Sequence, residues 1–464
     1  MLPLDHFTKQ VRGRVIAPGD ADYDRARRVF SGAVDHRPAA IVRPADAIDV
    51  ARVIALARDT GLELAVRGGG HSAAGYGVSE GGIVLDLRAM RSLAIDIEQR
   101  TAWAEGGLTA GEYTRAAGVH GLATGFGDTG SVGIGGITLS GGIGFLVRKH
   151  GLTIDDLLAA DVVTAGGELV RADAVQRPDL FWAIRGGGGN FGVVTRLKFR
   201  LHEVGTITGG MLMLPATPDV VAACVAEADA APDELSTIVT VLNAPPLPFV
   251  PAELHGRPVV MIQLAHAGAL EEGRRVADRF RALATPVADM VRPMPYPEIY
   301  GPEDEDARQV ATIRTQFADR IERPEAEAIL QALEAASAPM AATQIRVLGG
   351  AMARVSADAT AFAHRHSRIL INVAAMYQRP EERSEHEAWV EGLAGALRQR
   401  DDGAYVGFLD DEGEERVRAA YPGSTWDRLA AIKGRYDPDN VFRLNQNVEP
   451  AGVAVAGRRA THRA

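Results

Sequence analysis

Glycine-rich segments between residues 67 and 192 are the part of the sequence best suited to hold a reactive ligand. They are RGGGHS (67–72), GFGDTGSVGIGG (125–136), SGGIG (140–144) and RGGGGNFG (185–192). Glycine permits positive φ and close approach of the backbone to a ligand, and successive bare N–H groups form a concave site for anions. Several such loops in one region predict a single extended ligand that carries phosphate, such as a dinucleotide.

The order of these loops argues against a nicotinamide-binding Rossmann domain. A Rossmann fingerprint follows the first strand, opens a helix and precedes an acidic residue about 20 positions later. GIGGIT (133–138) instead lies in the middle of strand-rich sequence, and no GxxxxGK[ST] phosphate loop occurs. Within the first loop, His71 lies between Gly70 and Ser72. Such a histidine is either a hydrogen-bonding loop residue or a catalytic group.

The elements that position the first loop form a β-α-β pattern. AAIVRP (39–44) predicts a strand, Asp46 can cap the helix that follows, and Gly61 can end it. LELAVR (62–67) predicts the returning strand and leads directly into RGGGHS.

The sequence divides near residue 205, after which glycine becomes sparse. Before this point, LAIDIEQRTAWAE (93–105) and DVVTAGGELV (161–170) predict two hairpins. After it, strands such as TQIRVLGG (343–350) and RILINVAAMY (368–377) alternate with amphipathic helices. This alternation predicts an α+β domain with one sheet and helices on one of its faces.

The composition is that of a globular protein with two or three domains. The chain has 464 residues, of which 46% are hydrophobic, and its formal net charge is −10. An acidic balance argues against nucleic acid or an anionic membrane as a partner. No apolar run approaches the ~18 residues of a membrane helix, and the N-terminus lacks the layout of a secretory signal. The sequence therefore predicts a cytoplasmic protein.

A metal site is not expected from this sequence. The one cysteine, Cys224, cannot build a disulfide framework or a thiolate metal site. HRH (364–366) is the nearest approach to a ligand cluster, and such a segment is typically solvated.

Four motifs, in this order, resemble the berberine bridge enzyme-like flavoproteins of the vanillyl-alcohol oxidase superfamily, and look closest to its bacterial members. The motifs are RGGGHS, GIGGITLSGGIGFLVRKHGLTIDDL (133–157), DLFWAIRGGGGNFGVVT (179–195) and YDPDNVFRLNQNVEP (436–450), within a similarity that spans roughly residues 30–450.

This resemblance implies an α+β fold with a two-subdomain FAD-binding domain of the PCMH type and a substrate domain with an antiparallel sheet. The FAD-binding domain would cover 1–204, with its core at 36–204, and the substrate domain 205–410. Residues 411–450 would return to the FAD-binding domain, and 451–464 would form a flexible tail.

The resemblance also implies FAD bound covalently, through a bond from a ring nitrogen of His71 to the flavin 8α-methyl carbon. Many relatives carry a second link through a cysteine whose position corresponds to Thr129. Because the only cysteine is Cys224, a single covalent link is expected. The residues expected at the cofactor are Arg67, Gly68, Gly69, Gly70, His71, Ser72, Thr129, Gly130, Val132, Gly133, Gly135, Gly136, Gly142, Val194 and Asn445.

In the family, two strands of the substrate domain face the flavin ring. Strand alternation puts Gln344 and Arg346 on one face, and the resemblance places Gln344 or Arg346, Asn372 and Tyr405 nearest the flavin as the catalytic candidates. If GAYVGFLDDEG (403–413) is extended, Tyr405 and Phe408 point to opposite sides. Structural roles stay open for each candidate: an ion pair for Arg346, a backbone contact for Asn372 and a core position for Tyr405.

The familiar catalytic bases of the family are incomplete in this chain. Ile143 stands where many members have a tyrosine that lowers the pKa of a catalytic tyrosine, and Gln344 stands where others have a glutamate. Glutamine does not accept a proton at neutral pH. Three explanations stay open: Tyr405 assisted by the charge of Arg346, a substrate that needs little help from a base, or a base from an unplaced loop.

The function expected from the resemblance is that of an oxidase. A small organic alcohol or amine would lose hydride from a C–H next to O, N or an aromatic ring, and dioxygen would become hydrogen peroxide. The small Val132, three places after the cysteine position, favours dioxygen as the acceptor. The alternatives are a dehydrogenase with another acceptor and a redox-silent flavin-binding cyclase or binding protein. Exposed apolar helix stripes would suit a homodimer.

Overall fold

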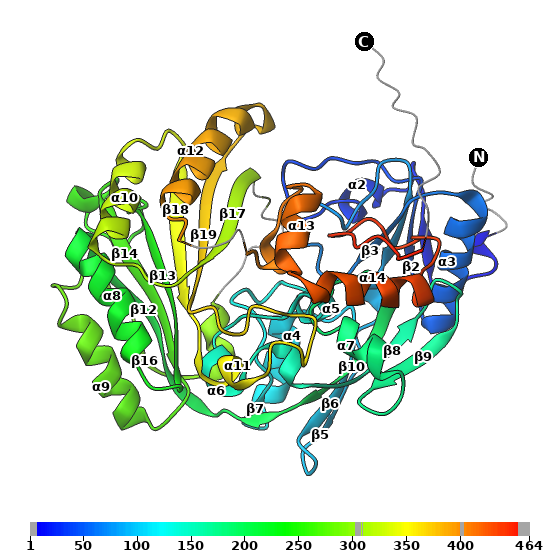
Figure 1. The fold of residues 1–464 in the computed structure, drawn as a ribbon, viewed down its shortest axis with the longest axis horizontal. Helices are drawn as coiled ribbons and strands as arrows, with labels where there is room; N and C mark the ends of the chain where they lie inside the picture. The colour runs from blue at the N-terminus through cyan, green and yellow to red at the C-terminus, as the bar shows by residue number, and fades with distance from the viewer. Residues whose placement is uncertain (1–6, 302–307, 309, 400–402, 453–464) are drawn as a thin grey trace.

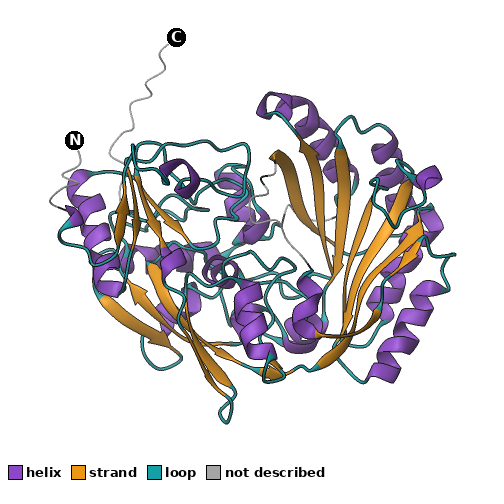
Figure 2. Ribbon diagram, turned by 180° about the vertical axis from the view of Figure 1, so that it is seen from behind, coloured by secondary structure: helices purple, strands orange, loops and turns teal. Residues whose placement is uncertain are grey.

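The computed structural model describes residues 7–301, 308, 310–399 and 403–452. Two main sheets lie in the N-terminal part of the chain, one large sheet lies between residues 206 and 377, and the two parts face each other (Figures 1 and 2). Helices accompany these largely antiparallel sheets, so the predicted α+β class is confirmed. The N-terminal part has the architecture expected of an FAD-binding domain.

The first sheet carries the RGGGHS loop at its edge. β4 lies between β2 and β3 and is parallel to both, so β3 is an edge strand and the loop leaves its end. Asp46 caps α3 by accepting the N–H groups of Ile48 and Asp49, and Gly61 ends it at φ 69°, as predicted. The elements are β1 (Arg14–Ile16), α2 (Tyr23–Ala26), β2 (Ala40–Arg43), α3 (Ala47–Thr60), β3 (Leu64–Arg67) and β4 (Ile83–Asp86).

The second sheet is antiparallel and contains both predicted hairpins, which are confirmed as β5–β6 and β8–β9. Gly167 has φ 82° at the turn of the second hairpin. The strands, in sheet order, are β5 (Leu93–Asp96), β6 (Thr101–Glu105), β10 (Val193–Arg200), β8 (Leu157–Val163) and β9 (Leu169–Asp173), and a separate pair joins β7 (Leu122–Ala123) to β11 (His202–Glu203). The helices of this part are α4 (Ala110–Gly118), α5 (Ile134–Ser140), α6 (Val147–His150) and α7 (Pro178–Ala183).

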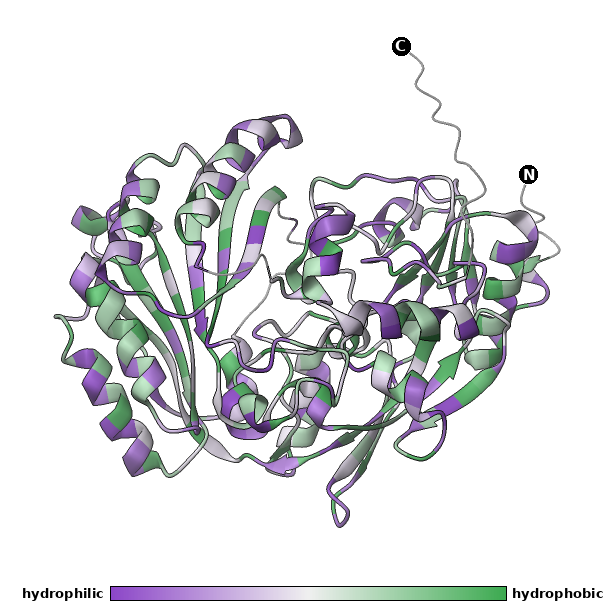
Figure 3. Cartoon of the chain, in the orientation of Figure 1, coloured by the Kyte–Doolittle hydropathy of each residue, from purple (hydrophilic) through white to green (hydrophobic). Residues whose placement is uncertain are grey.

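The large sheet is antiparallel and has four helices on its outer face (Figure 2). Its strands are mostly hydrophobic, whereas the covering helices alternate between hydrophilic and hydrophobic residues (Figure 3). This confirms one sheet with helices on one face, and leaves the opposite face toward the N-terminal part. The strands are β12 (Thr206–Pro215), β13 (Leu235–Asn243), β14 (Pro258–His266), β15 (Ala288–Asp289), β16 (Arg292–Pro295), β17 (Val310–Ala318), β18 (Met340–Val347) and β19 (Ile369–Tyr377); the helices are α8 (Pro218–Ala230), α9 (Leu270–Arg281), α10 (Arg323–Glu334) and α12 (Arg383–Ala396), with α11 (Gly350–Arg354) after β18.

The C-terminal helices α13 (Glu414–Ala420) and α14 (Ser424–Tyr436) return to the N-terminal part (Figure 1). The ammonium of Lys433, fully buried in α14, donates to the carbonyl oxygen of Phe442 at 2.8 Å and to Oδ1 of Asn190 at 3.4 Å, and lies 3.3 Å from Asp437. Asn190 belongs to the last glycine segment and also accepts the N–H of Val448 at 3.0 Å. These bonds hold residues 442–448 against the glycine loops. Most of the tail predicted at 451–464 lies outside the described residues.

Two local predictions are wrong. Residues Val406–Phe408 form a 3-10 turn rather than a strand, so Phe408 comes to the same side as Tyr405, with ring centroids 5.0 Å apart. HRH is not a solvated segment, because the Arg365 side chain is fully buried and forms two hydrogen bonds, of 2.7 and 2.8 Å, with Asp155. This ion pair joins the large-sheet part to the N-terminal part.

No helix among the described residues is long and apolar enough to cross a membrane. Cys224 is buried within α8 as a free thiol, and burial raises its pKa to about 12.

Candidate functional site

A cavity of about 490 Å³ lies between the glycine loops and the inner face of the large sheet. It brings together residues from the first loop, the second glycine segment, two strands of the large sheet and the C-terminal segment. Of the predicted site residues, those in its wall are Arg67, Gly68, Gly69, Gly70, His71, Ser72, Thr129, Val132, Gly133, Gly135, Gly136, Val194, Gln344, Arg346, Asn372, Tyr405 and Asn445.

Two predicted cofactor residues, Gly130 and Gly142, are not part of the cavity wall. The carbonyl of Gly130 accepts the N–H of Gly111 at 2.8 Å. Gly142 has φ 81°, and a Cβ there would lie 1.9 Å from Oγ1 of Thr153, so only glycine fits. Its N–H donates to the Tyr405 hydroxyl at 3.0 Å. Gly142 therefore acts on the site through Tyr405.

The first two glycine segments meet at Gly69 and Gly133. A Cβ on Gly69 would lie 2.3 Å from the backbone nitrogen of Gly133, and a Cβ on Gly133 would lie 2.2 Å from that of Gly69. Gly70 adopts φ 79°, which side chains rarely allow. The loops can pack this closely, and present bare backbone to the cavity, only because these residues are glycines.

Arg67 supports the loop from beneath. Its side chain is buried, and Nη2 donates to the carbonyl of Ala26 at 2.7 Å and to Oδ2 of Asp86 at 3.0 Å. Burial lowers the pKa of Arg67 to about 10 against the opposing charge of Asp86. Burial alone would raise the pKa of Asp86, but Arg67 and Arg88 outweigh it and hold that pKa well below its usual value. The two terminal nitrogens of the guanidinium are thus bonded to protein groups, whereas Nε has no partner among the described residues.

His71 lies parallel to Phe30, with 4.5 Å between ring centroids and 20° between the planes. Both residues line the cavity. The N–H of Phe30 donates to the carbonyl of Gly70 at 3.0 Å, which ties Phe30 to the loop. Phe30 was not among the predicted site residues, because no local pattern in the sequence relates it to the first glycine loop.

The inner face of the large sheet contributes a row of polar residues. Gln344 of β18 is paired in register with Asn372 of β19. The predicted alternation is confirmed, because Ile345 and Val347 pack into the core beneath the helices. Asn372 is 8% exposed, and its Oδ1 has no partner among the described residues.

An ion pair between Arg346 and Asp128 crosses from the large sheet to the second glycine segment. Nη2 of Arg346 also donates to Oε1 of Gln344 at 3.2 Å, and the guanidinium lies 5.0 Å from the centroid of the Phe408 ring. The sequence left an ion pair open for Arg346, without indicating which carboxylate would be its partner. A signal was present: Asp128 is the only acidic residue between Glu112 and Asp155.

Tyr405 is buried, with its hydroxyl at the backbone of the third glycine segment. Burial raises the pKa of Tyr405 to about 12, although the N–H groups of Gly142 and Ile143 and the charge of Arg346 favour the phenolate. At neutral pH the hydroxyl is therefore protonated and can donate a hydrogen bond. Of the three explanations for the missing base, a Tyr405 phenolate is the one that burial disfavours.

The residues of the cavity fit an FAD. Bare glycine loops suit phosphate groups, and buried polar atoms without partners mark places where a ligand can complete the hydrogen bonding. Within the described chain such atoms include Oδ1 of Asn445, Oδ1 of Asn372, and Nε and Nη1 of Arg346. All three residues line the cavity.

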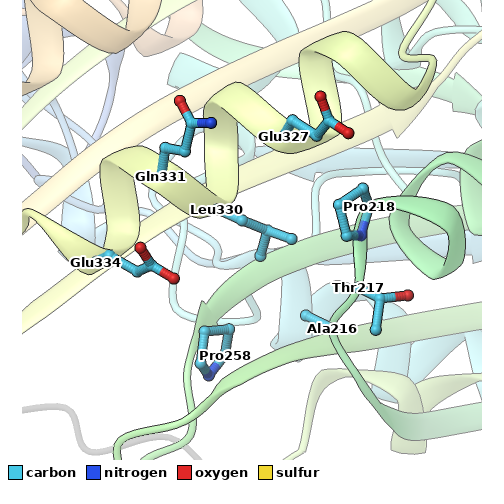
Figure 4. Close-up of a pocket in the computed structure, with 8 residues that line it drawn as sticks. All are labelled: Ala216, Thr217, Pro218, Pro258, Glu327, Leu330, Gln331 and Glu334. Carbon is cyan, nitrogen blue, oxygen red and sulfur yellow. The ribbon is translucent and has the colours of Figure 1, made fainter.

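A second hollow, of about 330 Å³, lies elsewhere on the large-sheet part, between α10 and the segment that precedes α8 (Figure 4). It contains none of the predicted site residues. It is lined by Ala216, Thr217, Pro218, Pro258, Glu327, Leu330, Gln331 and Glu334.

Comparison with known proteins places these features in a family context. Residues 38–173 match the model of an FAD binding domain, and residues 404–449 match the model described as berberine and berberine like. The chain is 33% identical to (R)-6-hydroxynicotine oxidase of Paenarthrobacter nicotinovorans, over 95% of this chain and 98% of that protein.

Solved structures agree with this similarity. The crystal structure of 6-hydroxy-D-nicotine oxidase from Arthrobacter nicotinovorans matches with a TM-score of 0.85 and 30% identity, over 95% of this chain and 98% of that one. Glucooligosaccharide oxidase from Acremonium strictum, described with a 6-S-cysteinyl, 8α-N1-histidyl FAD, matches with a TM-score of 0.84 and 25% identity, over 96% and 99%.

Proposed function

Because the chain belongs to the berberine bridge enzyme-like family of FAD-linked oxidoreductases, we propose that it is an oxidase with one covalent link from His71 to FAD. The family membership makes it an FAD-linked enzyme with the expected PCMH-type fold. The observation that carries the proposal is the cavity itself, which joins the His71 loop to the polar row of Gln344, Arg346 and Asn372.

Residues of the chain divide the work of the site. Loop 68–72, and Gly133 with the start of α5 as far as Gly136, would hold the phosphate groups through backbone N–H groups. Asn445 would contribute a side-chain amide. Bound FAD supplies the chemistry of accepting hydride. The inner sheet face would hold a small organic molecule with its reactive C–H next to O, N or an aromatic ring. Tyr405 would orient it as a hydrogen-bond donor.

The single covalent link rests on residue types at two positions. Thr129, in the cavity wall, stands at the position of the second, cysteinyl link in many relatives, and Cys224 is buried in α8 of the large-sheet part. The small Val132 in the same wall supports dioxygen as the acceptor. Cytoplasmic location and a homodimer stay predictions of the sequence.

The first experiment is acid precipitation of the purified protein, followed by measurement of flavin absorbance in pellet and supernatant. We expect flavin in the pellet for wild type and in the supernatant for His71→Ala. Colour in the wild-type supernatant would contradict the histidyl link, and a protein without flavin would contradict the proposed function.

The second experiment is a screen for substrates by peroxide release, with 6-hydroxynicotine, cellobiose and vanillyl alcohol as the first compounds. Anaerobic bleaching of the flavin by a compound that gives no peroxide in air would favour a dehydrogenase with another acceptor.

A further inference from the structure

Asp128 is the only acidic residue among the described residues of the cavity wall. The other titratable side chains of the wall are Arg67, His71, Tyr76, Arg346 and Tyr405. Arg67 and Arg346 carry no basic lone pair at any pH near neutrality. The groups able to take a proton from a bound molecule are thus Asp128, His71 and the two tyrosines.

The two tyrosines are poor proton acceptors in this arrangement. Burial raises the pKa of Tyr405 to about 12, although the N–H of Gly142, 3.0 Å from the hydroxyl, favours the phenolate. The Tyr76 hydroxyl donates toward Asp411 at 3.5 Å, and burial raises its pKa as well. His71 is the residue that the proposed function assigns to the flavin link. Asp128 is therefore the remaining side chain of the wall that can accept a proton from a bound molecule.

The geometry leaves Asp128 free to accept. Its Oδ2 receives Nη2 of Arg346, and its Oδ1 receives the hydroxyl of Thr129 at 3.2 Å. A carboxylate has about four lone-pair positions, so capacity remains on both oxygens. The Asp128 side chain is 23% exposed and its partner Arg346 only 5%, which makes the carboxylate the accessible member of the pair.

We propose that Asp128 is the proton acceptor of the site and that Arg346 is the positioning residue that holds it there; this rests on the proposed function. As the substrate C–H bond breaks and its electron pair passes to FAD as hydride, the proton of the adjacent O–H or N–H moves to Asp128. A C=O or C=N bond forms, and the proton later leaves to solvent. The carboxylate thus comes from the second glycine segment rather than from a substrate-domain strand.

Arg346 fixes the direction of the Asp128 carboxylate and balances its charge. Its Nε and Nη1 have no partner in the described part of the chain, so they can meet an acceptor atom of the bound molecule. Because the charges of Arg346 and Asp128 cancel, the pair adds no net charge to the site. The site suits a neutral alcohol or amine with a second polar group as hydrogen-bond acceptor.

The test begins without a substrate, using sulfite, an anion that adds to oxidised flavin and bleaches its absorbance. We titrate flavin-loaded wild type, Asp128→Asn, Arg346→Gln, the double variant and Asp278→Asn. Loss of the negative charge should tighten sulfite binding on the order of tenfold in Asp128→Asn, and loss of the positive charge should weaken it by a similar factor in Arg346→Gln. The double variant should lie near wild type, because both charges are gone.

Asp278→Asn is the matched control, because it removes an exposed carboxylate that pairs with Arg281 in α9, away from the cavity wall. Its sulfite affinity should equal that of wild type. Melting temperatures accompany every titration, and Asp128→Glu, which keeps the carboxylate, should retain the wild-type affinity. A purely structural ion pair would move both single variants in the same direction. That result, or an unchanged affinity in Asp128→Asn, overturns the inference.

The chemical role is then tested with whichever of 6-hydroxynicotine, cellobiose or vanillyl alcohol bleaches the wild-type flavin anaerobically. Asp128→Asn should slow the bleaching by roughly a hundredfold or more, as loss of a general base does, while Asp278→Asn leaves it unchanged. Equal rates in Asp128→Asn and wild type overturn the inference but leave the proposed oxidase intact. Absence of flavin from wild type overturns the proposed function first.

Discussion

The imidazole of His71 stacks on the ring of Phe30, with centroids 4.5 Å apart, and both residues line the cavity. Phe30 is itself bonded to the glycine loop of His71 through the carbonyl of Gly70. The stack restricts rotation of the imidazole, so its orientation toward the cavity is set before any ligand binds. A bond from a ring nitrogen to a carbon requires such alignment.

Phe30→Ala is expected to slow formation of the covalent flavin link by roughly two- to tenfold, the worth of one aromatic stack. Phe30→Tyr keeps the ring and should behave as wild type. The measurement is the fraction of flavin retained in the acid pellet as a function of time after apoprotein is mixed with FAD. The control is Phe249→Ala, which removes an exposed ring in the loop after β13. Equal rates in Phe30→Ala and wild type would show that the stack does not orient His71.

Gly69→Ala should destabilise the protein by about 1–3 kcal/mol, because the new Cβ would overlap the backbone of Gly133. Flavin content should fall with it, since the two loops must separate. Gly392→Ala is the control, because a Cβ there has nothing within 4 Å and α12 gains helix propensity. Urea unfolding and the flavin-to-protein ratio measure both effects. A Gly69→Ala protein with wild-type stability would contradict the close contact.

The Tyr405 phenol should resist ionisation until about pH 12. Its folded pKa is raised above the usual value near 10, so the stabilisation it contributes is present below about pH 10 and is lost as the pH rises through about 12. Subtracting the tyrosinate absorbance of Tyr405→Phe from that of wild type should give no signal between pH 8 and pH 10. A difference signal in that interval would return Tyr405 to the role of catalytic base.

Lys433→Met should cost about 3–5 kcal/mol of unfolding free energy, because it leaves the buried Asp437 without its cation. Residues 442–448 should loosen, and Asn445 with them, so incorporation of flavin should fall. Arg435→Met on the same helix removes an exposed ion pair with Asp179 and should cost less than about 1 kcal/mol. Urea unfolding and the flavin-to-protein ratio distinguish the two, and similar costs in both variants would argue against the buried anchor.

The sequence by itself determined the features that depend on local chain geometry. Glycine-rich segments predict positive φ and exposed backbone amides, and Asp46 and Gly61 predict the two ends of α3. Strand alternation places Gln344 and Arg346 on the face opposite Ile345. Each follows from residue types within a few positions of one another, where backbone sterics and periodicity act. The four motifs, in their order along the chain, then indicated the family.

Only the tertiary structure decided which groups meet and which protonation state they hold. Asp128 and Arg346 are 218 positions apart, and no residue pattern near either one predicts that they form an ion pair. The pKa of Tyr405 depends on burial by residues from both parts of the chain, and Phe408 reached the same side through a turn that strand alternation did not predict. Pairing and desolvation are properties of packing across the whole molecule, because each depends on distances that local sequence does not set.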